Sequence, residues 1–258
     1  MGRDMHSAAL QPAVREPVPD SDFMDEYAPL FDLQQQLGDY LRSLLPTARL
    51  RRQTVLREND LRLWLIDPEG MDAPLEHGEA AAVFAEPPYW CFCWGSGLAL
   101  ARRILASPEC VQGKSILDLG CGSGVVAIAA ALAGARRVIA CDLDPWALQA
   151  ARLNAAENGV ELEYLSSFTE LDDPVDVLVA ADVLYDWENR PLLQSFRQAA
   201  AEVWLADSRV ASFSEPGYRA EAQERAVTLP DLGESETVKN VRFYRAASDV
   251  AGAKPTVE

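Results

Sequence analysis

Short apolar runs alternate with stretches of helical spacing over residues 115–213, which predicts strands and helices that follow one another along the chain. We expect strands at 115–119, 137–141, 161–165, 175–181 and 209–213, with helices between them. Two further strands, near 224–229 and 238–246, should form a C-terminal hairpin. The pattern predicts an α/β fold, a doubly wound, mostly parallel, seven-stranded Rossmann-like sheet.

A helix and a β-hairpin are predicted ahead of this sheet. Apolar residues recur at helical spacing over 25–45 and alternate over 50–66 around an Asn59-Asp60 turn. Residues 71–86 are expected to be a loop, with or without a short alanine-rich helix. We therefore divide the chain into a disordered N-terminus (1–22), an extension of helix and hairpin (23–86), a sheet domain (87–247) and a frayed tail (248–258).

Composition narrows the choice of partners. The formal net charge of −17 argues against nucleic acid, because a phosphate backbone is itself anionic. No apolar run approaches the roughly 20 residues of a membrane span, so we expect no membrane partner. The five cysteines form no C-x-x-C pair and the two histidines are isolated, so we expect reduced cysteines, a cytoplasmic location and no metal. A small molecule or a basic protein fits the charge better.

A glycine-rich loop follows the first strand of the sheet and precedes a helix. Gly120, Gly122 and Gly124 remove side chains from this loop, so backbone N–H groups can approach a ligand. The dinucleotide fingerprint would have its third glycine where this chain has Val125, and Asp118 would repel a pyrophosphate. The same carboxylate would attract a ligand that carries an ammonium and a sulfonium group. The loop therefore predicts S-adenosylmethionine as cofactor and disfavours a nicotinamide cofactor.

The second strand also ends in an acid. Asp142 follows the apolar run 137–141, and an acid at that place in a βαβ unit hydrogen-bonds ribose hydroxyls. Asp144 and Pro145 should be the N-cap and first residue of the next helix. Either acid alone could be a solvated turn residue. With Asp118 and three glycines upstream, a nucleotide site is the stronger interpretation.

A third acid, Asp182, follows the strand at 175–181. Ligands of open α/β sheets bind beyond the carboxyl ends of the strands, so we expect Asp182 near the methionine part of the cofactor and its methyl group. Tyr185 would add a hydroxyl and an aromatic face. Both are candidate catalytic residues, because either can accept a hydrogen bond from an attacking amine. Alternatively, Asp182 caps the next turn and Tyr185 packs in the core.

An aromatic segment precedes the sheet domain's first helix. If residues 87–94 are extended, Trp90, Phe92 and Trp94 share one side of the chain. Together they could cover the cofactor or enclose an alkylammonium group. Aromatic residues at such spacing more often pack in a core, and the residues alone favour that interpretation.

These motifs resemble a known family. Ile-Leu-Asp-Leu-Gly-Cys-Gly-Ser-Gly at 116–124, followed by Asp142, resembles class I (seven-β-strand) S-adenosylmethionine-dependent methyltransferases. Pro-Tyr-Trp-x-Phe-x-Trp at 88–94 and Asp-x-x-Tyr-Asp at 182–186 are similar to the lysine methyltransferases of the electron transfer flavoprotein β subunit and their bacterial relatives. The resemblance implies that Asp118 and the glycines hold the amino-acid end of the cofactor and that Asp142 holds its ribose. It also implies that Trp94 lines the cofactor site, that Ser167 faces adenine, and that Asp182 and Tyr185 flank a target lysine.

The resemblance further implies N-methylation of a protein lysine, with the electron transfer flavoprotein β subunit or a similar protein as partner. The chain departs from the family pattern in three places. Residues 95–98 are Gly-Ser-Gly-Leu where the family has Pro-Gly-Gly-Gln, Ser167 replaces an asparagine, and Glu215 replaces an aspartate. The missing glutamine removes a polar group near the substrate and leaves the acceptor open. A small amine such as nicotinamide is the alternative acceptor, and a non-catalytic binding module of the same fold is the third hypothesis.

Overall fold

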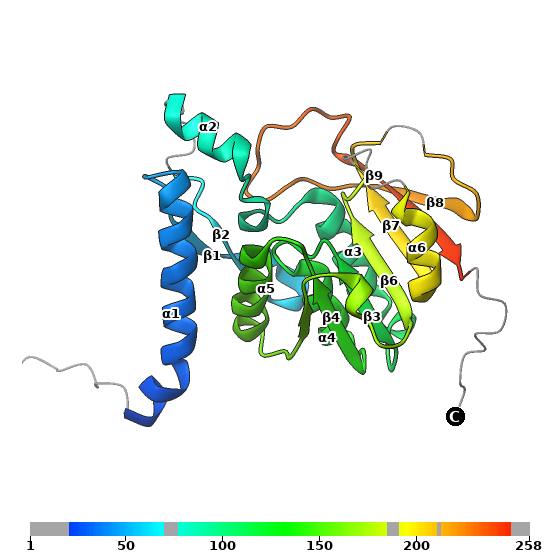
Figure 1. The fold of residues 1–258 in the computed structure, drawn as a ribbon, viewed down its shortest axis with the longest axis horizontal. Coiled ribbons are helices and arrows are strands. Elements are labelled where there is room, and N and C mark those ends of the chain that lie inside the picture. Colours follow the sequence, from blue (N-terminus) through cyan, green and yellow to red (C-terminus); the bar gives the residue numbers. More distant parts are fainter. Residues whose placement is uncertain (1–20, 70–76, 185–190, 211–212, 249–258) are drawn as a thin grey trace, which may run out of the picture.

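Seven strands form one central sheet in the part of the chain that the structure, a computed structural model, describes: residues 21–69, 77–184, 191–210 and 213–248 (Figure 1). The strands are β3 (Ser115–Leu119), β4 (Arg137–Cys141), β5 (Glu163–Leu165), β6 (Val175–Ala181), β7 (Ala200–Asp207), β8 (Tyr218–Arg225) and β9 (Asn240–Ala247). They lie in the order β5-β4-β3-β6-β7-β9-β8. The five strands β3 to β7 are parallel, and β9 is antiparallel to both of its neighbours. The predicted doubly wound, mostly parallel sheet is confirmed.

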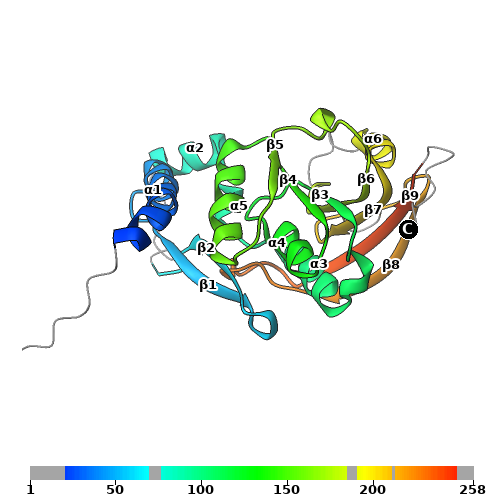
Figure 2. The ribbon, with the colours of Figure 1, turned by 90° about the horizontal axis from the view of Figure 1, so that it is seen from below.

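Helices cover both faces of this sheet (Figure 2). One face carries α3 (Gly95–Ala106), α4 (Val125–Leu132) and α5 (Pro145–Glu157), whose apolar residues join the larger core cluster. The other face is covered by α6 (Leu192–Ala199), through Leu193 and Phe196. The chain order reverses at β3, which lies between β4 and β6. Such a switch point leaves a crevice at the carboxyl ends of the strands, where α/β proteins bind ligands.

The N-terminal helix and hairpin pack against α5. Helix α1 (Ser21–Leu44) lies beside α5, and the antiparallel hairpin of β1 (Leu50–Leu56) and β2 (Leu61–Ile66) packs on the same helix (Figures 1 and 2). Leu61, Leu63 and Leu65 are fully buried in the cluster that also contains α3 and α4. The predicted helix and hairpin are confirmed, and the alanine-rich stretch forms α2 (His77–Ala85). The division of the chain at residue 87 stays a prediction.

The predicted position of the fifth strand is wrong. It was expected at 209–213, whereas β7 is Ala200–Asp207. The run Ala199-Ala200-Ala201 favours a helix by local propensity. In the fold, however, β7 pairs with β6 on one side and β9 on the other. Its residues Val203, Trp204 and Leu205 are buried under the helices that cover the sheet. Tertiary pairing therefore overrides the local preference for helix.

The bounds of three other strands also differ from the expectation. The third strand begins at Glu163 instead of 161, and β8 is Tyr218–Arg225 instead of 224–229. β8 is an edge strand whose charged side chains are mostly exposed, so it carries little apolar signal. Its partner β9 lies two residues later than expected at its start, and the two form the predicted hairpin.

Candidate active site

A cavity of about 1430 Å³ opens at the carboxyl ends of the parallel strands. The predicted site residues on its lining are Trp94, Gly120, Gly122, Asp142, Ser167 and Asp182. Asp118 and Gly124 lie behind this surface and do not line it. Tyr185 lies outside the described residues, so its predicted role is not tested. The fold thus brings together residues from four strand ends and from the segment before α3.

The glycine loop is held tightly between β4 and α5. Gly124 has a φ of 80°, and a Cβ there would lie 3.0 Å from the backbone Cα of Ala151. Gly122 has a φ of 51°, lines the cavity, and would meet no atom within 4 Å if it carried a Cβ. One glycine is therefore required by close packing, and the other leaves open space in front of the loop. Such space lets a ligand approach the backbone.

Asp118 supports the start of α4 from behind the loop. Its carboxylate is 2% exposed, and Oδ2 accepts a hydrogen bond from the backbone N–H of Ala127 at 2.9 Å. That N–H belongs to the first turn of α4, where backbone donors lack partners within the helix. Burial raises the pKa of Asp118 to about 7, although the bond from Ala127 opposes the shift.

Asp142 joins the end of β4 to the glycine loop. Its Oδ2 accepts from the backbone N–H of Gly122 at 2.9 Å, and its Oδ1 accepts from that of Asp144 at 3.0 Å. Burial raises the pKa of Asp142. Each carboxylate oxygen keeps a second lone pair, so Asp142 can still accept from hydroxyl groups in the cavity. Asp144 in turn accepts from the N–H of Trp146 at 2.8 Å, which confirms it as the N-cap of α5.

Asp182 is the most constrained acid in the cavity wall. It has a φ of 51°, unusual for a residue with a side chain, and its carboxylate is bound by two serines. Ser96 donates its hydroxyl at 2.7 Å and its backbone N–H at 3.3 Å. Ser208 donates the same two groups at 2.9 Å and 3.0 Å. Four donors thus fix the orientation of this carboxylate. Neither serine was predicted, because no local pattern marks its contact with Asp182.

The aromatic segment divides its side chains between the core and the cavity. Residues Tyr89–Cys91 form a 3-10 turn, so the condition that residues 87–94 are extended is not met. Trp90 is 1% exposed and packs in the cluster of α1 and α5, which confirms the packing interpretation for that residue. Trp94 instead lines the cavity, with its Nε1 donating to the carbonyl of Tyr89 at 2.9 Å. The guanidinium carbon of Arg209 lies 5.1 Å from its ring centroid.

The N-terminal helix contributes to the cavity through Tyr40. This ring stacks on Trp146, with 4.2 Å between centroids and 12° between planes, and its hydroxyl donates to Glu86 Oε2 at 2.9 Å. All three residues line the cavity. Burial and the neighbouring Glu86 carboxylate raise the pKa of Tyr40 to about 12. Sequence reasoning missed Tyr40 and Trp146, since their contact joins two elements far apart in the chain.

Ser167 lies in the wall at the end of β5. Its hydroxyl accepts from the backbone N–H of Thr169 at 3.3 Å and caps the short 3-10 turn η4 (Phe168–Glu170). Ser166 and Phe168 line the cavity on either side of it. Ser167 therefore presents a polar group in a partly apolar part of the cavity.

Negative charge dominates the cavity lining. The carboxylates among its described residues are Glu86, Asp142, Asp144, Asp172, Asp173 and Asp182, and the cation among them is Arg209. A cavity of this charge favours cationic ligands. Over the described ranges, we find no group of three or more His, Cys, Asp or Glu residues that could hold a metal ion. No helix within those ranges has the length and apolarity to span a membrane.

Comparison with known proteins finds related methyltransferases. The family model described as "Ribosomal protein L11 methyltransferase (PrmA)" matches residues 104–188. The "Electron transfer flavoprotein beta subunit lysine methyltransferase" of Xenopus laevis is 38% identical over 135 residues, which cover 49% of this chain and 55% of that protein. Its Danio rerio counterpart is 32% identical over 207 residues, which cover 76% of this chain and 73% of that protein.

Among solved structures, the magnesium protoporphyrin IX methyltransferase of Synechocystis PCC 6803 superposes with a TM-score of 0.47 at 14% identity, over 89% of this chain and all of that one. The match to the Xenopus protein spans about half of that relative's length, whereas the match to the Danio protein spans nearly three quarters. The chain belongs to the class I, seven-β-strand methyltransferase family that includes the electron transfer flavoprotein β-subunit lysine methyltransferases.

Proposed function

We propose that this protein is an S-adenosylmethionine-dependent N-methyltransferase that modifies lysine side chains of a protein substrate. The observation that carries the proposal is the carboxylate-lined cavity at the switch point, with Asp142 and Asp182 at the ends of β4 and β6 and the glycine loop after β3 between them. Membership of the family supports the same chemistry.

The residues of the cavity suit this cofactor. Asp142 has free lone pairs for ribose hydroxyls, and the space in front of Gly122 lets a ligand reach the loop. Trp94 offers an aromatic face, and Ser167 a hydroxyl among apolar neighbours. Bound S-adenosylmethionine would supply a methyl group on a positively charged sulfur. The surrounding carboxylates would stabilise that charge and the ammonium of its amino-acid end.

Asp182 would act on the acceptor. An amine attacks only in its neutral form, and a fixed carboxylate can accept a hydrogen bond from its N–H while the C–N bond forms. The two serines hold the Asp182 carboxylate in place, which limits the reorganisation required during the reaction. Tyr185 is part of this proposal as a second group at the target amine.

The acceptor remains the open part of the proposal. We favour the electron transfer flavoprotein β subunit or a similar protein, since relatives that share up to 43% identity bear that name. The matching family model names ribosomal protein L11 instead. A small amine such as nicotinamide is the second candidate. The cavity of about 1430 Å³ exceeds the roughly 300–1000 Å³ typical of small-molecule sites, so it has room for a lysine side chain or for a small amine.

A cytoplasmic location also belongs to this proposal. All five cysteines are free, as the proposed location requires.

Methyl transfer from labelled S-adenosylmethionine tests these candidates directly. Purified protein is incubated in parallel with the flavoprotein β subunit, with ribosomal protein L11 and with nicotinamide. Label on a lysine of either protein, absent with the Asp182→Ala variant, is the expected result. Label on nicotinamide alone would favour the small-amine function. Cofactor binding without transfer to any acceptor, including a whole lysate, would favour a binding module.

A further inference from the structure

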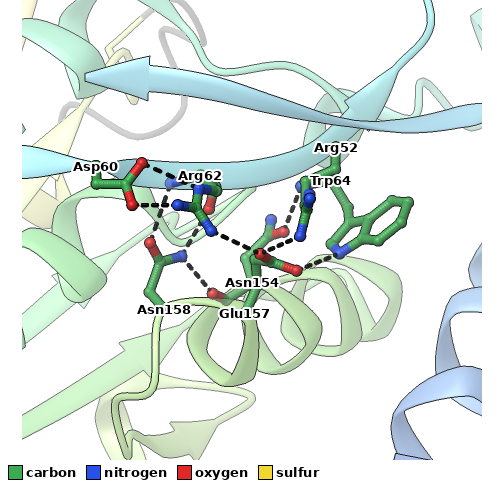
Figure 3. Close-up of polar contacts among 7 residues, drawn as sticks. All are labelled: Arg52, Asp60, Arg62, Trp64, Asn154, Glu157 and Asn158. Carbon is green, nitrogen blue, oxygen red and sulfur yellow. Dashed lines mark hydrogen bonds and ion pairs between the residues drawn. The ribbon is translucent and has the colours of Figure 1, made fainter. Parts of the chain in front are cut away.

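Asn154 on α5 connects the N-terminal hairpin to the glycine loop. Its side chain is fully buried, and both ends of its amide are hydrogen-bonded. Oδ1 accepts from the backbone N–H of Trp64 in β2 at 2.7 Å, and Nδ2 donates to the backbone carbonyl of Ser123 at 2.9 Å. Figure 3 shows Asn154 on the face of α5 that meets the hairpin. One amide therefore joins three elements that are distant in the chain.

The hairpin backbone determines the orientation of this amide. If Oδ1 and Nδ2 exchanged places, the NH2 group would face the Trp64 N–H, and the oxygen would face the Ser123 carbonyl. Both contacts would then be repulsive, and four buried polar groups would lose their partners. The N–H of Trp64 thus directs the donor side of Asn154 toward the loop.

The loop depends on α5 at two adjacent points. Ser123 lies between Gly122, whose N–H is bound by Asp142, and Gly124, which packs against Ala151 with no space for a Cβ. Ala151 and Asn154 are three residues apart and so lie on the same face of α5. From this face, Asn154 donates to the carbonyl of Ser123. Without this bond, the peptide between Ser123 and Gly124 would keep the bond from the Gly124 N–H to the carbonyl of Cys121 at 2.7 Å but would lose the tether on its carbonyl side.

We propose that Asn154 is a positioning residue for cofactor binding: it fixes the backbone of the loop at 122–124 in the shape that a ligand meets. The proposal rests on the proposed function only in taking that loop as part of the cofactor site. It also assigns the hairpin a role, because β2 orients the amide that supports the loop.

Asn158 provides a matched control one turn further along α5. Its Oδ1 accepts from the N–H of Arg62 at 3.0 Å, and its Nδ2 donates to the carbonyl of Arg62 at 2.6 Å (Figure 3). Its remaining bond, to the carbonyl of Asn154 at 2.7 Å, lies within the helix. Asn158 therefore fastens the same hairpin to the same helix without a bond to the loop. Glu157 adds further hairpin contacts, with Trp64 Nε1 and Arg52, that both variants keep.

The experiment compares Asn154→Ala with Asn158→Ala in the full chain. Binding of S-adenosylhomocysteine is measured by isothermal titration, and hydrogen exchange of the 120–124 amides is measured without ligand. We expect Asn154→Ala to weaken binding about tenfold and to speed exchange in the loop, because a buried carbonyl loses its donor. Asn158→Ala should change neither by more than about twofold, although it also lowers stability. The KM for S-adenosylmethionine should rise with Asn154→Ala while kcat at saturation stays near that of the wild type.

Two results would overturn the proposal: unchanged binding and loop exchange with Asn154→Ala, or equal losses with both variants. If Asn154→Ala does not fold, Asn154→Asp keeps an acceptor for Trp64 and removes the donor to Ser123, and it is judged by the same criteria. Failure of the wild-type protein to bind S-adenosylhomocysteine would count against the proposed function. In that case, loop exchange in the ligand-free variants still decides the role of Asn154.

Discussion

Ser96 donates both its hydroxyl and its backbone N–H to the carboxylate of Asp182, at 2.7 Å and 3.3 Å. Ser96 lies in the first turn of α3 and Asp182 directly after β6, 86 positions apart. Together with the same pair of bonds from Ser208, this contact fixes the carboxylate in the cavity wall before a ligand binds. A preorganised acid of this kind suits a reaction that requires one amine to be held in line with a methyl group.

Asp182→Asn should lower kcat by about 100-fold or more, because the amide nitrogen cannot accept from an amine and would face serine donors. Asp176→Asn is the matched control, since Asp176 at the other end of β6 binds the hydroxyl and N–H of Ser115 in a similar way, each at 2.7 Å. Both substitutions should destabilise the fold by about 1–3 kcal/mol, but only the first should impair transfer. Methyl transfer at saturating cofactor is the measurement, and near-normal activity of Asp182→Asn would contradict the assigned role.

The pH dependence of stability should change in Asp118→Asn. The pKa of this carboxyl is about 7 in the folded protein, against an ordinary value of 3.8. Between those values the folded state holds a proton that the unfolded chain has released, so this group's contribution to stability falls as the pH rises from about 4 to 7. Asparagine can still accept from Ala127 and has no such proton. The variant should therefore gain about 2 kcal/mol relative to the wild type between pH 5 and pH 8 in urea unfolding. Parallel stability curves for the two proteins would refute the assignment.

Tyr40→Leu should weaken cofactor binding about fivefold, because the stack on Trp146 supports the wall after Asp144 and is worth about 1 kcal/mol. Phe31→Leu serves as control, since Phe31 lies on the same helix and is 61% exposed. Titration with S-adenosylhomocysteine gives both dissociation constants. Equal affinities for Tyr40→Leu and the wild type would show that α1 only covers the protein.

Trp94→Ala should mainly weaken cofactor binding, whereas Trp90→Ala should mainly lower the free energy of unfolding. Trp90 is fully packed, so its truncation should lower the free energy of unfolding by about 3–5 kcal/mol. Trp94 is half-buried at the cavity wall, so its truncation should cost less stability and weaken cofactor binding about tenfold. Chemical unfolding gives the free energy of unfolding of both variants, and titration with S-adenosylhomocysteine gives their dissociation constants. A Trp94 variant with normal affinity would place that ring outside the cofactor site.

Much of the candidate site followed from local spacing. Gly120, Gly122, Asp142 and Asp182 could be placed because glycines mark a tight loop and because parallel strands end at the same edge of a sheet. The bonding of these acids could not be predicted. Asp118 caps α4 behind the loop, and the donors to Asp182 come from α3 and from the residue after β7. A carboxylate accepts from whichever donors the packing brings within about 3 Å, and the spacing of residues in the sequence does not predict which donors those are.

Local patterns in the sequence were enough to predict the succession of strands and helices, the glycine loop and the acids at the strand ends, because each depends on residues within one turn or one strand of the others. It misplaced β7, since alanines carry a local preference for helix that pairing with β6 and β9 overrides. The packing of the whole chain was needed to show that Trp90 lies in the core while Trp94 lines the cavity. The same packing brings Tyr40 to the cavity wall and places Asn154 between the hairpin and the glycine loop. These contacts could not be predicted, because burial and hydrogen bonding between distant elements arise only when the chain packs.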